Sequence, residues 1–443
     1  MDDEARHPVE PRQGTLTHSW VERDQAVVWH GFTQMSTYAS NAPIIVERGE
    51  GRELIDVDGN RYLDAISSLW VTTLGHAVPE LDDALRSQID RIAHSTLLGN
   101  GNRITIEFAE ALAPRLPMDR PHLLFASDGA AAVEQAIKIA FQFWTNQGIS
   151  GRTKYLAFGG AYHGDTIGSL SIGAGGFGTS VFDPLRFPVL RAPGFDSPDA
   201  ISGAISLIEE HAGELAAVVV EPLVQGAAGM QMRPASEFAA LGRACVEHDV
   251  LLICDEVAVG FGRTGTLFAS EQCGLTPDLM AVGKGITGGY LAMSATAAND
   301  RVYSAFLGAD LSEATLYHGH SYSGNALAAA VGLRHLELID EWDVMANVSA
   351  RAGQLDGLLT ARVAKLSGVA AVRQHGLMVG IELAPPTEGL RWGRRVSAAC
   401  VAAGVLIRPL GDVVVIMAPL TITATEIERI VDVMADAIVS VTS

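Results

Sequence analysis

The amino-acid sequence predicts an α/β fold, with a mostly parallel sheet covered by helices and a smaller α+β domain beside it. Two observations carry this prediction. The chain has 443 residues and is 48% hydrophobic, which is enough for two closely packed domains. Between about residues 61 and 330, short apolar runs alternate with amphipathic runs, the rhythm of parallel strands joined by crossover helices.

Residues 1–60 are predicted to form an N-terminal arm followed by a segment of the small domain. Short alternating stretches at 44–47 and 54–57 lie around an Asp58-Gly59 turn. Alternation of apolar and polar residues next to such a turn is typical of antiparallel strands. We therefore expect a small β-meander here.

Residues 61–330 are predicted to form the large domain. The strand candidates are 122–126, 154–158, 216–220, 251–254 and 279–282. Amphipathic runs such as 131–144 and 237–247 separate them and predict helices.

Residues 331–443 are predicted to form the C-terminal small α+β domain. A long helix at about 324–340 leads into it, strands are expected at 378–383 and 413–417, and a helix at 425–439 closes the chain.

Charge and composition exclude several classes of partner. The 51 acidic and 31 basic side chains give a formal charge of −20, which disfavours binding to nucleic acid or to an anionic membrane surface. The four cysteines are widely spaced without a CxxC pair and suit a reducing compartment. The N-terminus is charged without an apolar core, so we expect neither a signal nor a transit peptide. No apolar run is long enough to span a membrane, and we expect a cytoplasmic protein.

Polar residues follow three of the predicted strands, at the edge where parallel sheets bind ligands. Asp255 follows the run 251–254, and Lys284, between two glycines, follows 279–282. Burial would lower the pKa of such an amine and favour Schiff-base chemistry. A bare Gly-Lys-Gly fits equally a lysine that reaches solvent, and a lone Asp fits a helix cap. Together, the amine and the carboxylate predict a pyridoxal 5'-phosphate site, in which Asp255 keeps the pyridine nitrogen protonated.

The remaining parts of this predicted site bind the phosphate and the ring. Asp128, Gly129 and Ala130 precede the helical run and place backbone N–H groups at its start, where phosphate binds. Tyr162 is predicted to stack on one face of the ring, and Val257 to pack on the other.

Three further motifs carry weaker signals. Residues 173–178 match GxGxxG, but no apolar strand leads into them, so we do not expect a dinucleotide site. His318-Gly319-His320 lacks a nearby third ligand, and no metal site is expected. Glu221 ends the run 216–220, where a structural and an active-site carboxylate are equally consistent with the pattern.

With these motifs in order, the chain resembles the class III aminotransferases of pyridoxal-phosphate fold type I over nearly its whole length. The motifs that carry the resemblance are 67–70 (Ser-Ser-Leu-Trp), 128–130, 161–166, 255–257, 260–265, 283–285 and 320–325. The resemblance implies a large domain with a seven-stranded sheet and a small domain built from both chain ends. It also implies a homodimer with active sites at the interface, where Ser321 of one protomer would reach the phosphate bound by its partner.

Within the family, the chain is most similar to the biotin-pathway branch. The segments involved are 29–35, 93–99, 224–227, 285–290 and 407–412. This implies transamination of 8-amino-7-oxononanoate to 7,8-diaminononanoate, with small-molecule keto acid and amino donor as partners. Family members that act on ornithine or 4-aminobutyrate carry a glutamate where this chain has Ala227. In those members, the glutamate pairs with the arginine that corresponds to Arg408. Because this chain lacks the glutamate, we expect Arg408 to bind a substrate carboxylate.

The same resemblance implies that Trp70, Phe32, Tyr162, Gly319 and Arg263 contact substrate. The donor is expected to be lysine or S-adenosylmethionine, with Leu69 and Phe32 resembling the lysine-using branch.

The expected reaction has ping-pong kinetics. In it, Lys284 forms the Schiff base with the cofactor and, once displaced, acts as the base. Two alternatives remain open: another class III activity, such as an ω-amino acid or amine:pyruvate aminotransferase, and a catalytically silent binding protein that kept the fold.

Overall fold

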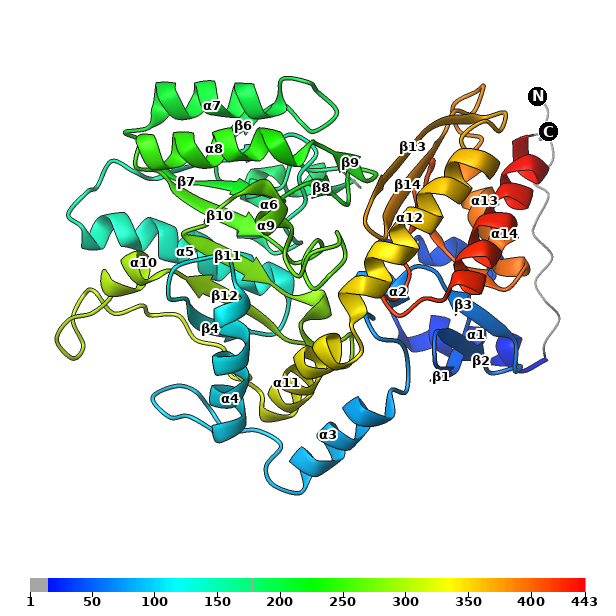
Figure 1. The fold of residues 1–443 in the computed structure, drawn as a ribbon, viewed down its shortest axis with the longest axis horizontal. Helices are drawn as coiled ribbons and strands as arrows, with labels where there is room; N and C mark the ends of the chain where they lie inside the picture. The colour runs from blue at the N-terminus through cyan, green and yellow to red at the C-terminus, as the bar shows by residue number, and fades with distance from the viewer. Residues whose placement is uncertain (1–14, 177, 443) are drawn as a thin grey trace.

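A computed structural model describes residues 15–176 and 178–442. The first 14 residues of the predicted N-terminal arm lie outside the described residues. Figure 1 shows two lobes, one built around the largest sheet and the other holding elements from both ends of the chain. The fold is α/β, as predicted.

The large lobe is organised by a seven-stranded sheet with the order β4-β12-β11-β10-β7-β5-β6. Its strands are β4 (His122–Ala126), β5 (Lys154–Phe158), β6 (Leu190–Ala192), β7 (Leu215–Val220), β10 (Leu251–Asp255), β11 (Leu279–Val282) and β12 (Ser294–Ala298). β12 runs antiparallel to both of its neighbours, whereas β11, β10, β7, β5 and β6 are parallel. The prediction of a mostly parallel sheet is confirmed.

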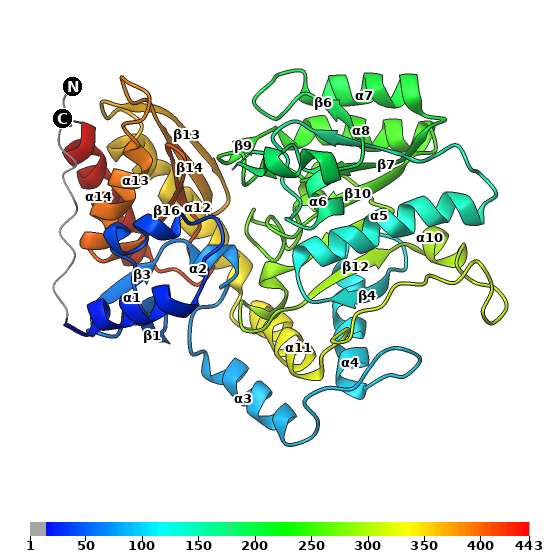
Figure 2. The same cartoon turned by 180° about the vertical axis from the view of Figure 1, so that it is seen from behind.

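Helices cover both faces of this sheet. Successive strand residues point to opposite faces, and both sets are apolar, so each face packs against helices. Leu156, Val218 and Leu252 pack with α7 (Ala200–His211) and α8 (Ala235–Glu247). Tyr155, Val219 and Ile253 pack on the opposite face with α5 (Gly129–Asn146). Figure 2 shows α5 in front of the strands, on the side away from the viewer of Figure 1.

Smaller elements connect and extend the large lobe. They are α3 (Pro79–Ile89), α4 (Arg103–Leu112), α6 (Ile167–Ile172), β8 (Val224–Gln225), β9 (Gln231–Met232), α9 (Ala269–Cys273), α10 (Asp300–Ser304) and α11 (Ala326–Glu341). The 3₁₀ helices of the chain are Met35–Thr37, Ala39–Asn41, Ala113–Arg115, Thr179–Leu185 and Lys284–Thr287. The GxGxxG motif begins at Gly173, directly after helix α6 and without a strand before it.

The five strands predicted for the large lobe are all present, within one residue of their predicted ends. β6 and β12 were not predicted. β12 has the sequence Ser-Ala-Thr-Ala-Ala, whose small and polar residues give no apolar run, although all five are buried. Its Thr296 hydroxyl donates to the Ala132 carbonyl of α5 (2.6 Å), a contact between strand and helix that the local sequence pattern does not reveal.

The second lobe combines the two ends of the chain. β1 (Val46–Glu50), β2 (Glu53–Asp56) and β3 (Arg61–Asp64) form the predicted meander, and β15 (Val405–Leu406) joins β3 in parallel. A second four-stranded sheet contains β13 (Val369–His375), β14 (Met378–Leu383), β17 (Val413–Ile416) and β16 (Arg408–Leu410). The helices of this lobe are α1 (Thr15–Val27), α12 (Val344–Arg362), α13 (Trp392–Ala402) and α14 (Ala424–Thr442).

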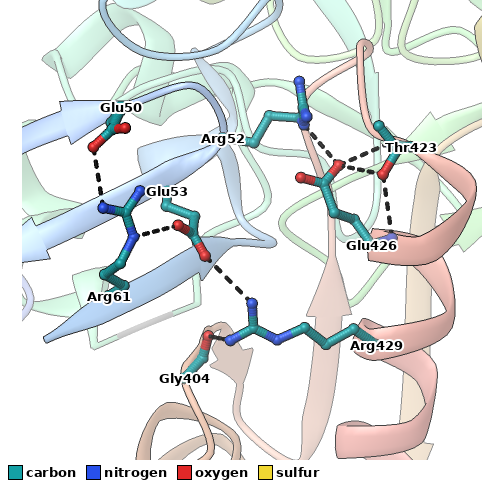
Figure 3. A network of polar contacts seen from close by, with 8 residues as sticks. All are labelled: Glu50, Arg52, Glu53, Arg61, Gly404, Thr423, Glu426 and Arg429. Carbon is teal, nitrogen blue, oxygen red and sulfur yellow. Dashed lines mark hydrogen bonds and ion pairs between the residues drawn. The ribbon is translucent and has the colours of Figure 1, made fainter.

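A polar network ties the meander to α14 at the surface (Figure 3). Arg61 pairs with Glu50 (3.0 Å) and Glu53 (2.6 Å), and Arg429 pairs with Glu53 (3.3 Å). Arg52 pairs with Glu426 (2.7 Å). The network therefore joins residues more than 350 positions apart in sequence.

The four cysteines are unpaired and buried, as expected for small apolar side chains. In the described part of the chain, no helix has both the length and the apolar character needed to cross a membrane.

Candidate active site

The parallel sheet brings the two predicted chemical groups to the same edge. Asp255 is the last residue of β10 and lies opposite Ala281 of the neighbouring strand β11. Lys284 follows β11 by two residues, at the start of a short 3₁₀ helix. The carboxylate and the amine therefore reach the site from adjacent strand ends.

Lys284 is held in a constrained backbone conformation and its amine is buried. Its φ is +43°, in the left-handed region that side chains with a Cβ rarely adopt. Burial lowers the pKa of its amine, while the charges of Asp255 and Glu221 oppose that effect. Its Nζ lies 5.5 Å from the centroid of the Trp70 ring. An amine with a lowered pKa is neutral at a lower pH and can act as a nucleophile or a base.

Asp255 is almost completely buried, and its two oxygens have different partners. Oδ2 lies 2.7 Å from His163 Nδ1, and Oδ1 accepts a hydrogen bond from the Val257 N–H (3.0 Å). His163 is itself buried, and its Nε2 has no partner among the described residues. These contacts fix the carboxylate in one orientation at the strand end.

Glu221 is a second buried carboxylate at this edge, where the sequence pattern left its role open. It follows β7, and its Oε1 accepts a hydrogen bond from the Tyr162 N–H (3.1 Å). Burial raises its pKa to about 7, with the charge of His163 opposing and that of Asp255 reinforcing the shift. Glu221 thus lies within the electrostatic field of the Asp255–Lys284 pair.

The N-terminus of α5 approaches the same edge. Asp128 caps the helix by accepting from the Ala131 N–H (2.9 Å), which leaves the N–H groups of Gly129 and Ala130 in the first turn, where helices have no internal acceptors. A Cβ at Gly129 would lie 2.5 Å from Val257 Cγ1. Only glycine permits this close packing, which brings Val257 against the start of the helix.

Tyr162 lies in the loop after β5, between Glu221 and the start of α6. Its hydroxyl donates to Asp165 Oδ2 (2.8 Å), and burial together with Asp165 raises its pKa. The ring is partly buried. Because both its backbone N–H and its hydroxyl are hydrogen-bonded, the ring is held in place in this loop.

The residues predicted to contact substrate lie in several places. Trp70 is buried beside Lys284, whereas Phe32 is 62% exposed. Gly319 lines a pocket together with Leu98 and His320. Their contacts with substrate stay predictions.

Arg408 and Arg263 differ sharply in environment. Arg408 begins β16 and is exposed, and no ion pair engages its guanidinium within residues 15–176 and 178–442. Ala227 lies in the β8–β9 hairpin, which approaches the same sheet through Gly229 and Val413. Arg263 is buried and donates to the Ala418 and Thr72 carbonyls (2.6 and 2.8 Å). These bonds give Arg263 a structural role, and its predicted substrate contact stays a prediction.

The site fits pyridoxal 5'-phosphate on the grounds of its own geometry. Lys284 and Asp255 lie at the ends of adjacent strands, and Asp255 is oriented by His163. The first N–H groups of α5 have no acceptor within the helix, which suits a phosphate. His163 was not singled out from the sequence, although its place directly after Tyr162 is a signal that could have identified it. Its role in orienting Asp255 becomes visible only in the contact between the two side chains.

Comparison with known proteins agrees with this geometry. The family model described as aminotransferase class-III matches residues 35–438. The adenosylmethionine-8-amino-7-oxononanoate aminotransferase of Nitratidesulfovibrio vulgaris is 44% identical over 95% of this chain and 81% of its own length. The protein of the same name from Geobacter sulfurreducens is 40% identical, over 96% of this chain and 98% of its own length.

Two solved structures are similar over most of the chain. The adenosylmethionine-8-amino-7-oxononanoate aminotransferase from Methanocaldococcus jannaschii has a TM-score of 0.92 and 39% identity, covering 95% of this chain and 98% of that one. An amine transaminase from an uncultivated Pseudomonas species, in a PLP-bound form, has a TM-score of 0.87 and 30% identity, covering 94% and 99%.

Proposed function

From the premise that this chain belongs to the class III aminotransferase family, we propose that it transfers an amino group to 8-amino-7-oxononanoate, forming 7,8-diaminononanoate in biotin biosynthesis. As a family member, the chain is a pyridoxal-phosphate-dependent transaminase of the α/β fold. The substrate assignment is carried by four relatives, 38–44% identical over at least 95% of this chain, that are all named for this reaction.

The exposed Arg408 supports the same acceptor. Among the described residues it forms no ion pair, so its guanidinium is available for a carboxylate, which it would bind through two parallel hydrogen bonds. Ala227 supplies no charge that would compete for it. A keto acid whose carboxylate lies far from its keto group suits a cation placed on the second lobe while Lys284 lies on the first.

Bound pyridoxal phosphate supplies an aldehyde that condenses with amines and a ring that withdraws electrons from the bound carbon. Burial lowers the pKa of Lys284 Nζ, which favours its role as a base. Once displaced from the cofactor, this amine would take a proton from the donor carbon and deliver it to the cofactor's aldehyde carbon. Asp255, held by His163, would stabilise positive charge on the ring nitrogen. Tyr162 would orient the ring, and the first N–H groups of α5 would hold the phosphate.

A donor screen with the purified holoenzyme tests this function. We expect 7,8-diaminononanoate to form from 8-amino-7-oxononanoate with S-adenosylmethionine or with lysine. The relatives' names specify adenosylmethionine, while Leu69 and Phe32 resemble the lysine-using branch, so both donors belong in the screen. Parallel double-reciprocal plots are expected for a ping-pong mechanism. Product with alanine and pyruvate-type acceptors alone would instead indicate an ω-amine:pyruvate aminotransferase.

We also propose that the enzyme is a cytoplasmic homodimer with active sites at the interface and Ser321 directed toward the partner's phosphate. Leu98, Tyr317 and Tyr322 are each at least 60% exposed and lie close to this segment, as is typical of an interface. The unpaired cysteines support a reducing compartment. Light scattering of the wild type and of Leu98→Asp tests the dimer, with a monomeric and inactive variant expected.

A further inference from the structure

Helix α2 (Ser67–Trp70) is a single turn of left-handed backbone. The φ angles are +50° at Ser67, +55° at Ser68, +109° at Leu69 and +70° at Trp70. The Trp70 N–H donates to the Ile66 carbonyl (2.9 Å) and the Val71 N–H to the Ser67 carbonyl (3.0 Å). None of the four is glycine. In left-handed backbone, the Cβ of any residue other than glycine lies too close to the following carbonyl oxygen. Such backbone persists only where its surroundings hold it.

One buried carboxylate, that of Asp64, binds this turn through hydrogen bonds. Asp64, the last residue of β3, is completely buried. Its Oδ1 accepts from the Ser68 N–H (2.9 Å), and its Oδ2 accepts from the Ser68 hydroxyl (2.8 Å). Oδ2 also lies 2.9 Å from His76 Nε2. Asp64 therefore accepts hydrogen bonds from both the N–H and the hydroxyl of Ser68, within the turn.

The two ends of the turn are fastened to the segment that follows β17. The Ser67 hydroxyl donates to the Met417 carbonyl (2.7 Å), and the Met417 N–H donates to the Ala65 carbonyl (2.8 Å). Arg263 links the Thr72 and Ala418 carbonyls. These bonds fix where the turn sits, while Asp64 fixes its conformation.

The turn presents Trp70 to the active site. The Trp70 ring is 8% exposed and lies within cation–π range of Lys284 Nζ, 5.5 Å from its centroid. On another side, a Cβ at Gly226 would lie 3.1 Å from the ring. The ring is thus wedged between the reactive lysine of the large lobe and the β8–β9 hairpin, and it bounds the space beside the amine.

We propose that Asp64 is a positioning residue of the transaminase site, which locks residues 67–70 in a left-handed turn and thereby fixes the Trp70 ring beside Lys284. The inference rests on the proposed function and deepens it, because the ring forms one wall of the substrate space. Asp64 touches neither Lys284 nor Asp255 and acts through Ser68 and the backbone.

Asp64→Asn and a matched control, Asp56→Asn, test this role in the holoenzyme. Asp56 is a buried carboxylate on the same sheet that accepts from the Asn60 N–H and the Tyr62 hydroxyl (both 2.8 Å), but it does not contact the turn. We expect Asp64→Asn to raise the KM for the keto acid roughly tenfold with kcat reduced less than about threefold. Asp56→Asn should lower the thermal midpoint similarly and leave KM unchanged. Equal KM effects in both variants would show a merely structural role and overturn the proposal.

A second readout follows the ring without measuring turnover. The loss of tryptophan fluorescence on cofactor binding is measured in each protein and in its Trp70→Phe derivative. The difference between these two losses is the quenching of Trp70 by the cofactor. We expect this quenching to be smaller in the Asp64→Asn background than in the wild type, because the ring moves away from the cofactor. An unchanged difference would overturn the proposal. If the wild type does not transaminate, the proposed function fails, yet this comparison still reports the position of Trp70.

The pair Ser68→Gly and Ser68→Ala isolates the backbone strain. Both variants lose the hydroxyl bond to Asp64 and keep the backbone bond, but only glycine adopts positive φ without steric cost. We expect Ser68→Gly to unfold at a higher temperature than Ser68→Ala. If Ser68→Ala is equally or more stable, the turn needs no lock and the role assigned to Asp64 is wrong.

Discussion

The predicted active-site residues Lys284 and Asp255 and the surface network of Figure 3 use the same kinds of charged group in opposite environments. Asp255 is 4% exposed and has fixed partners. In the surface network, Arg61 and Glu50 are 44% and 63% exposed. Water screens the surface charges, whereas burial shifts the pKa of the groups near Lys284. Burial, and not the number of ion pairs, therefore determines which charged groups of this chain have shifted pKa values that suit proton transfer.

The sharpest way to break this comparison is Lys284→Ala. We expect turnover to fall by more than about 10³-fold, because the base is lost, and the visible absorbance of the bound cofactor to change. Lys154→Ala is the control, since Lys154 pairs with Glu214 at the surface and should leave both measurements unchanged. A Lys284→Ala enzyme that kept both would refute the assignment.

Asp255→Asn tests the buried carboxylate. We expect kcat to fall about 10²-fold or more, because removal of one member of a buried charged pair is not compensated by solvent. Asp278→Asn is the control: Asp278 accepts from the Leu252 N–H and from Asn299 (both 3.0 Å) at the opposite ends of the same strands. It should lower stability and leave kcat unchanged, and equal losses of kcat would contradict the assignment.

Arg408→Lys tests the exposed cation. Lysine keeps the charge but loses the two-pronged geometry, so we expect the KM for 8-amino-7-oxononanoate to rise about tenfold with little change in kcat. Arg394→Lys serves as control, because Arg394 is exposed and donates a hydrogen bond to Asn41 Oδ1 (3.4 Å). If the two variants behave alike in steady-state kinetics, Arg408 does not bind the substrate carboxylate.

Glu221→Gln gives the pH dependence of the buried edge. The folded pKa of Glu221 is raised to about 7 from 4.5, so its stabilising contribution is complete below pH 4.5 and is lost as the pH rises through 7. Glutamine keeps the acceptor for the Tyr162 N–H and does not ionise. We therefore expect the thermal midpoints of wild type and variant apoenzymes to match near pH 5 and the variant to be more stable at pH 8.5. A constant difference across this range would contradict the raised pKa.

The smallest effect is expected at the surface. Arg61→Ala removes the pairs with Glu50 and Glu53, and we expect the thermal midpoint to change by less than about 2 °C. The change should diminish further in 1 M salt, which screens exposed charges. A large shift that salt does not reduce would mean that the network acts as the buried pair does.

Much of the fold could be predicted because local pattern and tertiary environment agree there. The strands β4, β5 and β11 begin and end at the predicted residues, since strands covered by helices on both faces carry nearly continuous apolar residues. β12 escaped prediction because its small residues are buried by close packing and not by their own hydrophobicity. The domain boundaries and the substrate contacts of Phe32, Gly319 and Arg263 stay predictions.

The class of fold and the placement of Lys284 and Asp255 at neighbouring strand ends could be read from the sequence, because both depend on residue types at strand ends. The phosphate site at the start of α5 stays a prediction. Three features came from the tertiary structure alone: Glu221 is close enough to Asp255 and Lys284 to interact electrostatically, His163 orients Asp255, and Asp64 binds Ser68 in the left-handed turn that ends at Trp70. The physical reason is that burial and backbone strain depend on contacts between segments distant in sequence. No local pattern records such contacts.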